Sequence, residues 1–392
     1  MLLPTYGSRP LMVERGEGCY LFDADGRRYL DFITGIGVNA LGYNHPAITA
    51  AIRDQAGLCV HTSNLHMHRY QEKLAEKPAE WSGLDYIFLS SSGTEAMEAA
   101  LKAARGLANK QGRKRHRIIS LENSFHGRTA GALAITGQAK YREPFVPLIP
   151  DVVFVQANDI AALEAAASDD TIAIVAETIQ GEGGIHPLDD AFLYAIRRVA
   201  NEHGALWIAD ETQCGLGRTG QRFAYQPHQP DIVVTAKPLA AGLPLGATMF
   251  SASAARGIDP GMHGTTFGGG PLTCRVALTF LEETKKLLPC IRRNGEYLHQ
   301  RLRELPHTLE IRGRGLMAGI QLAGPGEPFV QKALDAGLVI NCTHGNVLRL
   351  LPPFIAGKAE IDLACSILTK VLLEADASES SPSHCAEVSL SR

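Results

Sequence analysis

Between residues 86 and 251 the chain alternates short apolar segments with alanine-rich segments of helical length. The apolar segments are rich in β-branched side chains and nearly free of charge, which is typical of strands that are buried on both faces. Strands separated by helices pair through crossover connections, so the pattern predicts an α/β domain on a mainly parallel sheet. We expect seven strands, at Tyr86–Leu89, Arg117–Ser120, Val152–Val155, Ile172–Glu177, Ala205–Asp210, Asp231–Thr235 and Ala247–Ser251. Helices are expected at Glu95–Asn109, Ile160–Ala167 and Ala191–Glu202.

The segments on either side predict a second, smaller unit. Residues 11–32 alternate apolar and polar side chains around turns at Arg15–Gly18 and Asp23–Gly26, which indicates a small antiparallel sheet. Helices are expected from His45 to about Gln55 and from Pro271 to about Leu305. Further strands, which favour a smaller α/β lobe, are expected at Leu316–Leu322, Leu338–Asn341 and Val347–Leu350.

We therefore divide the chain into four parts. An N-terminal segment, 1–60, is expected to pack with the small lobe, and residues 61–270 form the large domain. Residues 271–375 form the small α/β domain. The last part, 376–392, is rich in serine and has the composition of a disordered tail.

Charge and cysteine content exclude several functions. Lysine and arginine number 38 against 41 aspartates and glutamates, a net charge of −3, which gives no electrostatic case for binding nucleic acid or an anionic membrane. The 8 cysteines include no CxxC pair, which argues for reduced thiols and against disulfides or a metal site. No stretch has membrane length and the first residues lack a signal-peptide pattern, so we expect a soluble, cytoplasmic protein.

An isolated lysine, Lys237, lies just past the end of the apolar strand at 231–235, and prolines and glycines then turn the chain away. Two interpretations are open. The side chain could reach solvent past the end of the strand. Alternatively, its amine could be kept partly desolvated and neutral, able to form a Schiff base with a carbonyl compound.

Ligands of open α/β sheets bind beyond the carboxyl ends of the strands, so groups that follow the other strands are candidate partners of Lys237. Asp210 ends a nearly apolar strand, where a carboxylate needs a cation or several donors, unless it only caps its own turn. Small hydroxyl residues and a glycine at 90–98 open a helix. They could seat a phosphate or form an ordinary N-cap.

The loop 123–129 brings Phe125 and Arg128 after the next strand. The pair could stack on a ring and bind a carboxylate, or simply be a core residue and a surface residue. Glycine-rich loops follow at 180–184 and 263–270, where the backbone can approach a ligand closely. Five such groups at strand ends favour one shared site.

In this order, these residues resemble the class III aminotransferases, which are pyridoxal-phosphate enzymes with the aspartate-aminotransferase-like fold (fold type I). The resemblance is greatest to the acetylornithine aminotransferase branch and extends from about Pro10 to Ala375. Its carriers are Tyr29–Phe32, Gly35–Gly42, Thr62–Leu65, Ser92–Ala96, Ser124–Thr129, Gln180–Gly184, Asp210–Glu211, Gln213, Ala236–Lys237, Phe267–Gly269 and Val347–Leu350.

The resemblance implies a role for each candidate. Lys237 would bind pyridoxal 5′-phosphate as a Schiff base and carry the proton, and Asp210 would pair with the pyridinium nitrogen. The phosphate would be held by Gly93 and Thr94 and, from the neighbouring subunit of a homodimer, by Thr266. The remaining contacts implied are Phe125 and Gln213 with the cofactor, and Arg128, Thr265, Glu182 and Arg349 with the substrates.

The reaction implied is transfer of the terminal amino group of N2-acetyl-L-ornithine to 2-oxoglutarate. The products would be N-acetyl-L-glutamate 5-semialdehyde and L-glutamate, a step of arginine biosynthesis. Arg128 would bind the distal carboxylate of both substrates. Arg349 would bind the α-carboxylate of glutamate, masked by Glu182 when no carboxylate is present, because an unpaired buried charge is costly.

Three alternatives stay open: ornithine or 4-aminobutyrate as the amine donor, a pyridoxal-phosphate mutase or lyase on the same fold, and a non-enzymatic binding protein. Lys237, Asp210 and Arg128 argue against the last of these. The chain also departs from the family pattern without losing a catalytic group. The departures are Pro238–Ala241 in place of a glycine-rich run, Thr212 for an apolar residue, Met97 and Gly270 for asparagines, and Thr178 for a proline.

Overall fold

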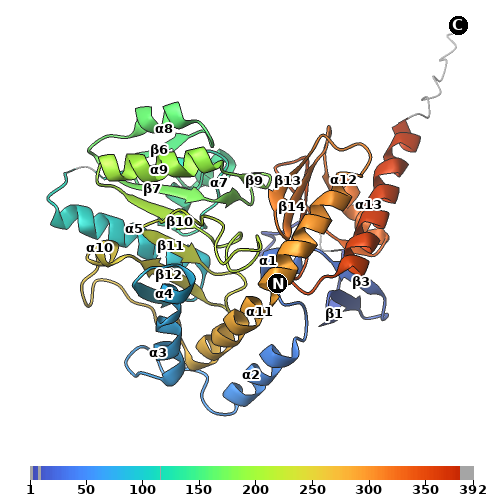
Figure 1. Cartoon of the computed structure of the whole chain (residues 1–392), viewed down its shortest axis with the longest axis horizontal. Coiled ribbons are helices and arrows are strands. Elements are labelled where there is room, and N and C mark those ends of the chain that lie inside the picture. Colours follow the sequence, from blue (N-terminus) through green and yellow to red (C-terminus); the bar gives the residue numbers. More distant parts are fainter. Residues whose placement is uncertain (1–2, 8–9, 115, 380–392) are drawn as a thin grey trace, which may run out of the picture.

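A seven-stranded sheet forms the core of the larger of two lobes in the computed structural model, which describes residues 3–7, 10–114 and 116–379 (Figure 1). β12 is antiparallel to both of its neighbours, and the other strands run parallel to one another. The order is β4 (Tyr86–Ser90), β12 (Gly246–Phe250), β11 (Ile232–Thr235), β10 (Leu206–Asp210), β7 (Thr171–Glu177), β5 (Arg117–Leu121) and β6 (Val152–Val155). The predicted mainly parallel sheet of seven strands is confirmed, and each strand lies within one residue of its expected bounds.

Helices cover both faces of this sheet. β7 is buried along its whole length, and its side chains point alternately to the two faces. Ala173 and Val175 pack in the cluster of α5 (Gly93–Lys110), whereas Ile174 packs with α9 (Asp190–Glu202) on the other side. α8 (Ile160–Ala166) lies beside α9. Because both faces are dry, these strands carry little charge before their last residues.

The smaller lobe contains a four-stranded antiparallel sheet with α12 (Glu327–Asp335) and α13 (Lys358–Glu379). Its order is β13 (Glu310–Arg314), β14 (Met317–Gln321), β17 (Val347–Leu350) and β16 (Asn341–Thr343). The prediction of one strand at 338–341 is wrong. β15 (Leu338–Val339) pairs in a different sheet from β16, because the chain crosses from one sheet to the other at Ile340. β13, which carries three charged residues in five, was not expected.

The N-terminal strands β1 (Val13–Glu17), β2 (Tyr20–Asp23) and β3 (Arg28–Asp31) form the expected antiparallel sheet. The first turn lies at Gly18, which has φ +56°, and not across 15–18, since Arg15 to Glu17 belong to β1. β15 of the small lobe pairs in parallel with β3. In Figure 1, β1 and β3 accordingly lie next to the small lobe, near α13. We propose from this pairing that the N-terminal segment packs with the small lobe. The divisions at residues 60, 270 and 375 stay predictions.

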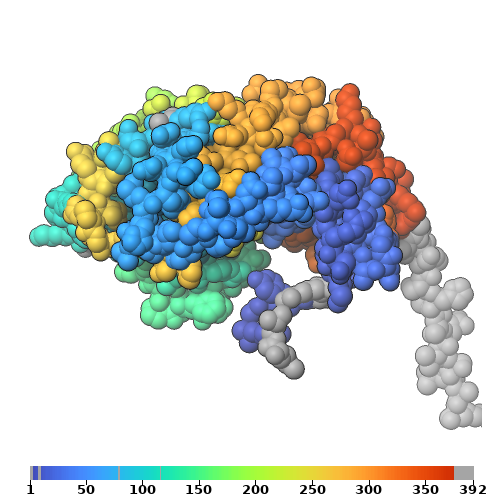
Figure 2. Space-filling view, turned by 90° about the horizontal axis from the view of Figure 1, so that it is seen from below, coloured from blue at the N-terminus to red at the C-terminus, as the bar shows by residue number. Residues whose placement is uncertain are grey.

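α11 (Pro271–Leu302) connects the two lobes as a helix of 32 residues. α2 (Pro46–Ala56) and α3 (Arg69–Ala75) pack along it, on the face shown in Figure 2. α13 continues to Glu379, so residues 376–379 of the predicted tail are helical, and 380–392 lie outside the described residues. Of the helices described, none combines the length and the hydropathy that crossing a bilayer requires. The remaining short elements are α1 (Thr34–Gly37), α4 (Lys77–Trp81), α6 (Ala130–Ala134), α7 (Ala139–Arg142), a 3-10 helix (Glu143–Phe145), β8 (Ile179–Gln180), β9 (His186–Pro187) and α10 (Ala252–Ala255).

Candidate active site

The carboxyl ends of β4, β5, β7, β10 and β11 meet at one edge of the large sheet, and a cavity of about 440 Å³ lies there. Each of these strands supplies at least one wall residue at its end or in the loop that follows it. Of the residues predicted for the site, the cavity is lined by Gly93, Thr94, Phe125, Arg128, Glu182, Asp210, Gln213 and Lys237. The topology therefore brings together groups that are up to 144 positions apart, from Gly93 to Lys237.

Lys237 follows β11 and lines the cavity. In the part of the chain that the structure describes, no hydrogen bond or ion pair holds its amine. Burial lowers the pKa of Lys237, and the Arg349 guanidinium lowers it further, against the opposing effect of the Glu182, Glu177 and Asp210 carboxylates. A larger fraction of the amine is therefore neutral at a given pH than in a free lysine, as a nucleophile requires.

Asp210 is the last residue of β10 and is 5% exposed. Its Oδ2 lies 2.8 Å from His126 Nδ1, and its Oδ1 accepts the Thr212 N–H at 3.0 Å. The second contact is the turn cap that the sequence left open as an alternative. The same carboxylate both caps its turn and lines the cavity, where two partners stabilise its charge.

Glu177 also lines the cavity, and the sequence analysis gave it no role. It ends β7 and lies opposite Asp210 in the ladder. Its carboxylate accepts the N–H of Phe125 at 2.9 Å and that of Gly181 at 3.0 Å, joining the loops after β5 and β7. Burial raises the pKa of Glu177 to about 7. A carboxylate at the end of an otherwise apolar strand is the same pattern that identified Asp210, so Glu177 could have been found.

The N-terminus of α5 serves as a cap and leaves room for an anion. Ser92 Oγ accepts the Glu95 N–H at 3.3 Å, and the Glu95 carboxylate accepts the Ser91 N–H at 2.6 Å. The cap thus uses the N–H groups of residues 91 and 95, while Gly93 and Thr94 line the cavity in the first turn. A Cβ on Gly93 would lie 3.0 Å from Thr212 Cγ2, so glycine keeps this wall open. First-turn N–H groups have no partner within the helix and bind phosphate readily.

Arg128 and Phe125 line the cavity, and both contact Tyr141 of α7, which is not itself a lining residue. The Arg128 guanidinium carbon is 3.9 Å from the centroid of the Tyr141 ring and 5.5 Å from that of Phe125. The two rings meet edge to face, with centroids 5.9 Å apart. Tyr141 follows Arg128 by thirteen positions, and no strand-end pattern marks it.

Arg349 of β17 extends from the small lobe and is 1% exposed. Its Nη1 lies 2.5 Å from Glu182 Oε1 and 3.3 Å from Gln213 Oε1, and its Nε donates to Asn341 Oδ1 at 3.1 Å. Burial alone would raise the pKa of Glu182, but Arg349 and Lys237 outweigh it and the pKa is lowered. Glu182 is therefore ionised and neutralises the buried guanidinium. Asn341, the third partner, was missed because it lies on a strand that the sequence misassigned.

Thr265 and Thr266 are not among the residues that line this cavity. Thr265 Oγ1 accepts the Gly268 N–H at 3.2 Å, and Thr266 is exposed on the loop between α10 and α11. A contribution of Thr266 to the site of a second subunit, and of Thr265 to substrate binding, stays a prediction.

Two departures from the family pattern have local roles in the fold. Thr178 donates its hydroxyl to Glu211 Oε1 at 2.5 Å, beside the N–H groups of Ala224 and Tyr225, and burial raises the pKa of Glu211 to about 7. Met97 is fully buried on the sheet-facing side of α5. Neither of these two residues lines the cavity, so neither departure takes away a lining group.

The cavity fits pyridoxal 5′-phosphate in its donor set. The Lys237 amine, which has no partner among the described residues, can bond a carbonyl carbon, and the N-terminus of α5 can bind a phosphate. The Asp210 carboxylate suits a protonated ring nitrogen, and Phe125 offers a ring face. The volume lies within the range of small-molecule sites.

Fold and site together define the class: a fold type I pyridoxal-phosphate enzyme, with its lysine, carboxylate and helix N-terminus around one cavity at the carboxyl edge of the sheet. The chain belongs to the class-III aminotransferase family, whose model matches residues 4–372. The predicted family, fold type and cofactor are thereby confirmed.

Named relatives cover nearly the whole chain. The acetylornithine aminotransferase of Aquifex aeolicus (strain VF5) is 43% identical over 375 residues, which are 95% of this chain and 99% of that protein. The ornithine aminotransferase of Toxoplasma gondii, with pyridoxal phosphate at partial occupancy in its active site, superposes with a TM-score of 0.91 at 31% identity, covering 96% of this chain and 92% of that one. The N-acetylornithine aminotransferase of Stenotrophomonas maltophilia K279a gives a TM-score of 0.82 at 31% identity, covering 95% and 98%.

Proposed function

We propose that this protein transfers the terminal amino group of N2-acetyl-L-ornithine to 2-oxoglutarate, producing N-acetyl-L-glutamate 5-semialdehyde and L-glutamate. The observation that carries the proposal is the 43% identity, over 95% of the chain, to an acetylornithine aminotransferase. The reaction would serve arginine biosynthesis. A cytoplasmic location stays a prediction.

Pyridoxal 5′-phosphate, when bound, supplies a carbonyl carbon that exchanges amino groups and a conjugated ring that accepts electrons from the reacting carbon. Gly93 and Thr94 would hold its phosphate, Asp210 its ring nitrogen and Phe125 one ring face. Gln213 would reach its phenolic oxygen. Lys237 would bind it covalently and then move the proton at the substrate's reacting carbon. Burial lowers the pKa of Lys237, so more of its amine is neutral and able to accept a proton than in a free lysine.

The two arginines would bind substrate carboxylates at two different positions. In acetylornithine the reacting terminal carbon carries no carboxylate, only two hydrogens beside its amine and its chain carbon. The carboxylate lies at the far end, where Arg128 would bind it. Glutamate reacts at its α-carbon, so its α-carboxylate needs a second cation close to Lys237. Arg349 would supply that cation when Glu182 moves aside, and Glu182 would cover it again for acetylornithine. The 2.5 Å contact between Arg349 and Glu182 supports this exchange.

Arg349→Ala is expected to impair the half-reaction with 2-oxoglutarate and to leave the half-reaction with acetylornithine nearly intact. A bidentate arginine–carboxylate contact in a dry site is worth about 2–5 kcal/mol, so kcat/KM for 2-oxoglutarate should fall roughly thirty-fold or more. Single-turnover absorbance measurements of each half would check this. Arg128→Ala, in contrast, should impair both halves.

Glu182→Gln is the matched control for that experiment. It keeps the size of the side chain but removes the charge that neutralises Arg349, so it should favour glutamate over acetylornithine. Equal losses in both halves for Arg349→Ala would refute the division of labour between the arginines, and the role of Glu182 would fall with it.

The amine donor is tested by a screen with 2-oxoglutarate as the acceptor. N-acetylornithine should give the highest kcat/KM, ahead of ornithine and 4-aminobutyrate. If ornithine were preferred, the chain would work as an ornithine aminotransferase, like the structural neighbour from Toxoplasma gondii. Formation of no glutamate with any of the three donors would overturn the proposed function.

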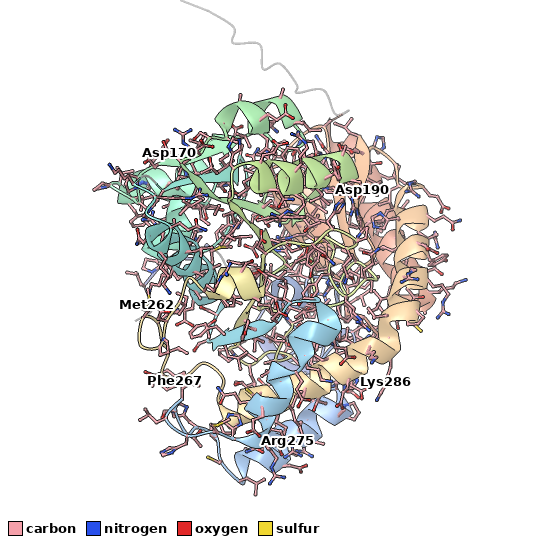
Figure 3. The ribbon with its side chains drawn as sticks, turned by 60° about the vertical axis from the view of Figure 1, so that its left-hand side comes forward. Asp170, Asp190, Met262, Phe267, Arg275 and Lys286 are labelled. Carbon is pink, nitrogen blue, oxygen red and sulfur yellow. The ribbon has the colours of Figure 1, made fainter. Side chains whose placement is uncertain are left out.

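We propose further that the active protein is a homodimer with composite sites. The loop between α10 and α11 carries the exposed apolar side chains of Met262 (51%) and Phe267 (71%), which lie at the edge of the molecule in Figure 3. Asn64 donates to the carbonyl groups of Thr265 and Gly268 and so joins this loop to a second one that exposes Leu65. Neighbouring exposed apolar side chains of this kind mark an interface. Thr266 would reach the phosphate in the partner subunit.

Mixing Lys237→Ala subunits with Thr266→Ala subunits is expected to restore activity. Each mixed dimer would contain one site with an intact Lys237 and an intact Thr266, because the two residues of a site would come from different chains. Activity assays after subunit exchange, with the dimer fraction measured by native mass spectrometry, would check this. Mixed dimers that form but recover no activity would contradict the composite site.

A further inference from the structure

Arg128 is held in place by an aromatic face. Its guanidinium carbon lies 3.9 Å from the centroid of the Tyr141 ring, close enough for a cation–π contact. Within residues 3–7, 10–114 and 116–379, no carboxylate pairs with Arg128 and no acceptor takes a hydrogen bond from it. The stacking contact therefore fixes the side chain while its N–H donors stay available at the cavity.

Tyr141 is itself positioned by its neighbours. Phe125 packs edge to face against it, with an interplanar angle of 82°, and thereby ties it to the residue expected to stack on the cofactor. The Tyr141 hydroxyl donates to no acceptor among the described residues. Tyr141 therefore contacts Arg128 through the face of its ring and not through its hydroxyl. Lys140 Nζ also lies near this ring, 4.9 Å from its centroid.

The two arginines of the site are held in opposite ways. Arg349 is neutralised by Glu182, so a ligand carboxylate has to displace a protein carboxylate before it can bind. Arg128 rests on a neutral ring, which orders the guanidinium without using its donors or cancelling its charge. A carboxylate at the position of Tyr141 would also order Arg128, but it would compete with the substrate.

We propose that Tyr141 is a positioning residue for recognition of the substrate's distal carboxylate: its ring orders the Arg128 guanidinium so that both edges of the fork stay free for the ligand. The inference rests on the proposed function in that it assigns the distal carboxylate to Arg128. Tyr141 does not line the cavity that contains Lys237, so it should act on substrate affinity and selectivity and leave the chemical step unchanged.

The test compares two amine donors on the holoenzyme. N-acetylputrescine is acetylornithine without its carboxylate, so it keeps the reacting amine and the acetyl group. Tyr141→Leu should lower kcat/KM for acetylornithine about ten-fold, mainly through KM, and leave N-acetylputrescine unchanged. Tyr141→Phe is the matched control: it keeps the ring face, removes only the unpartnered hydroxyl, and should match the wild type.

A double-mutant cycle separates positioning from a general structural role. In an Arg128→Ala background, Tyr141→Leu should have no further effect on acetylornithine. Equal losses for the two donors, or a full ten-fold loss in the Arg128→Ala background, would overturn the proposal. If Tyr141→Leu does not yield folded protein, Tyr141→Gln takes its place.

Calorimetric titration with glutarate gives a readout that does not depend on the amine donor. Tyr141→Leu should weaken glutarate binding about ten-fold and Tyr141→Phe should not. An unchanged affinity in Tyr141→Leu would count against Tyr141. Absence of transfer from acetylornithine by the wild type would instead count against the proposed function and leave this measurement valid.

Discussion

Lys237→Ala is expected to reduce amino-group transfer by about 10⁴-fold or more, because on the proposed function the variant would lose both the covalent partner of the carbonyl group and the base that moves the proton. The fold should persist. No protein group among those described bonds the Lys237 amine, and removing a partly desolvated amine relieves an unfavourable burial. The free energy of unfolding of the protein without cofactor should therefore stay the same or increase. Single-turnover rates and urea titrations would measure the two effects.

The covalent role can be located directly. Borohydride treatment of the wild type should fix the cofactor on the peptide that contains Lys237, as mapped by mass spectrometry. Lys110→Ala is the matched control, since Lys110 lies at the far end of α5 in an exposed ion pair with Asp259. A label on any other lysine, or normal turnover by Lys237→Ala, would remove Lys237 from the centre of the site.

Asp210→Asn is expected to lower kcat by about 10²–10³-fold, the range observed when one preorganised electrostatic contact to the reacting system is removed. The substitution keeps the size of the side chain. Its amide oxygen can still accept the Thr212 N–H, and its NH₂ can donate to His126 Nδ1 once the proton of that ring moves to Nε2. His126 Nε2 is buried without a partner among the described residues. What the variant loses is the negative charge that would face the ring nitrogen of the bound cofactor.

Measured kcat and the affinity for the cofactor, obtained by spectroscopic titration, would check this. Asp231→Asn is the control, because Asp231 precedes β11 at the other end of the same sheet and binds Arg197 and the Trp207 N–H. It should lower stability and leave kcat close to that of the wild type. Near-normal turnover in Asp210→Asn would contradict this role and leave Asp210 only the function of capping its turn.

The large lobe could be predicted from the sequence because its strands are buried on both faces and end in polar groups. β7 shows why: every residue from Thr171 to Glu177 is buried, so the apolar run and its sudden end are visible without a structure. The small lobe was harder. β13 has three charged residues in five and lies on a partly exposed sheet, and at Ile340 the chain changes sheets without any turn residue.

Site residues were predictable where one rule applied, namely that chemistry collects after the carboxyl ends of parallel strands. Lys237, Asp210 and Gly93 follow that rule. Glu177 follows it as well, although it was not among the predicted site residues. Tyr141 and Asn341 do not follow it. They matter because they hold Arg128 and Arg349, and such contacts between side chains on different elements appear only once the chain is folded.

In the described chain, β12 is the strand of the large sheet that runs against its neighbours. It begins at the edge where β11 ends, so the segment between Lys237 and Gly246 forms a cavity wall from residues 242–245 and turns straight back into the sheet. A parallel strand in place of β12 would need a crossover of about a dozen residues. The position of the cavity wall would then not depend on the position of Lys237. With the short connection that is present, an insertion at residues 242–245 would displace Lys237. Engineering of this scaffold for bulkier amines should therefore exchange side chains at 242–245 and leave the length of that segment untouched.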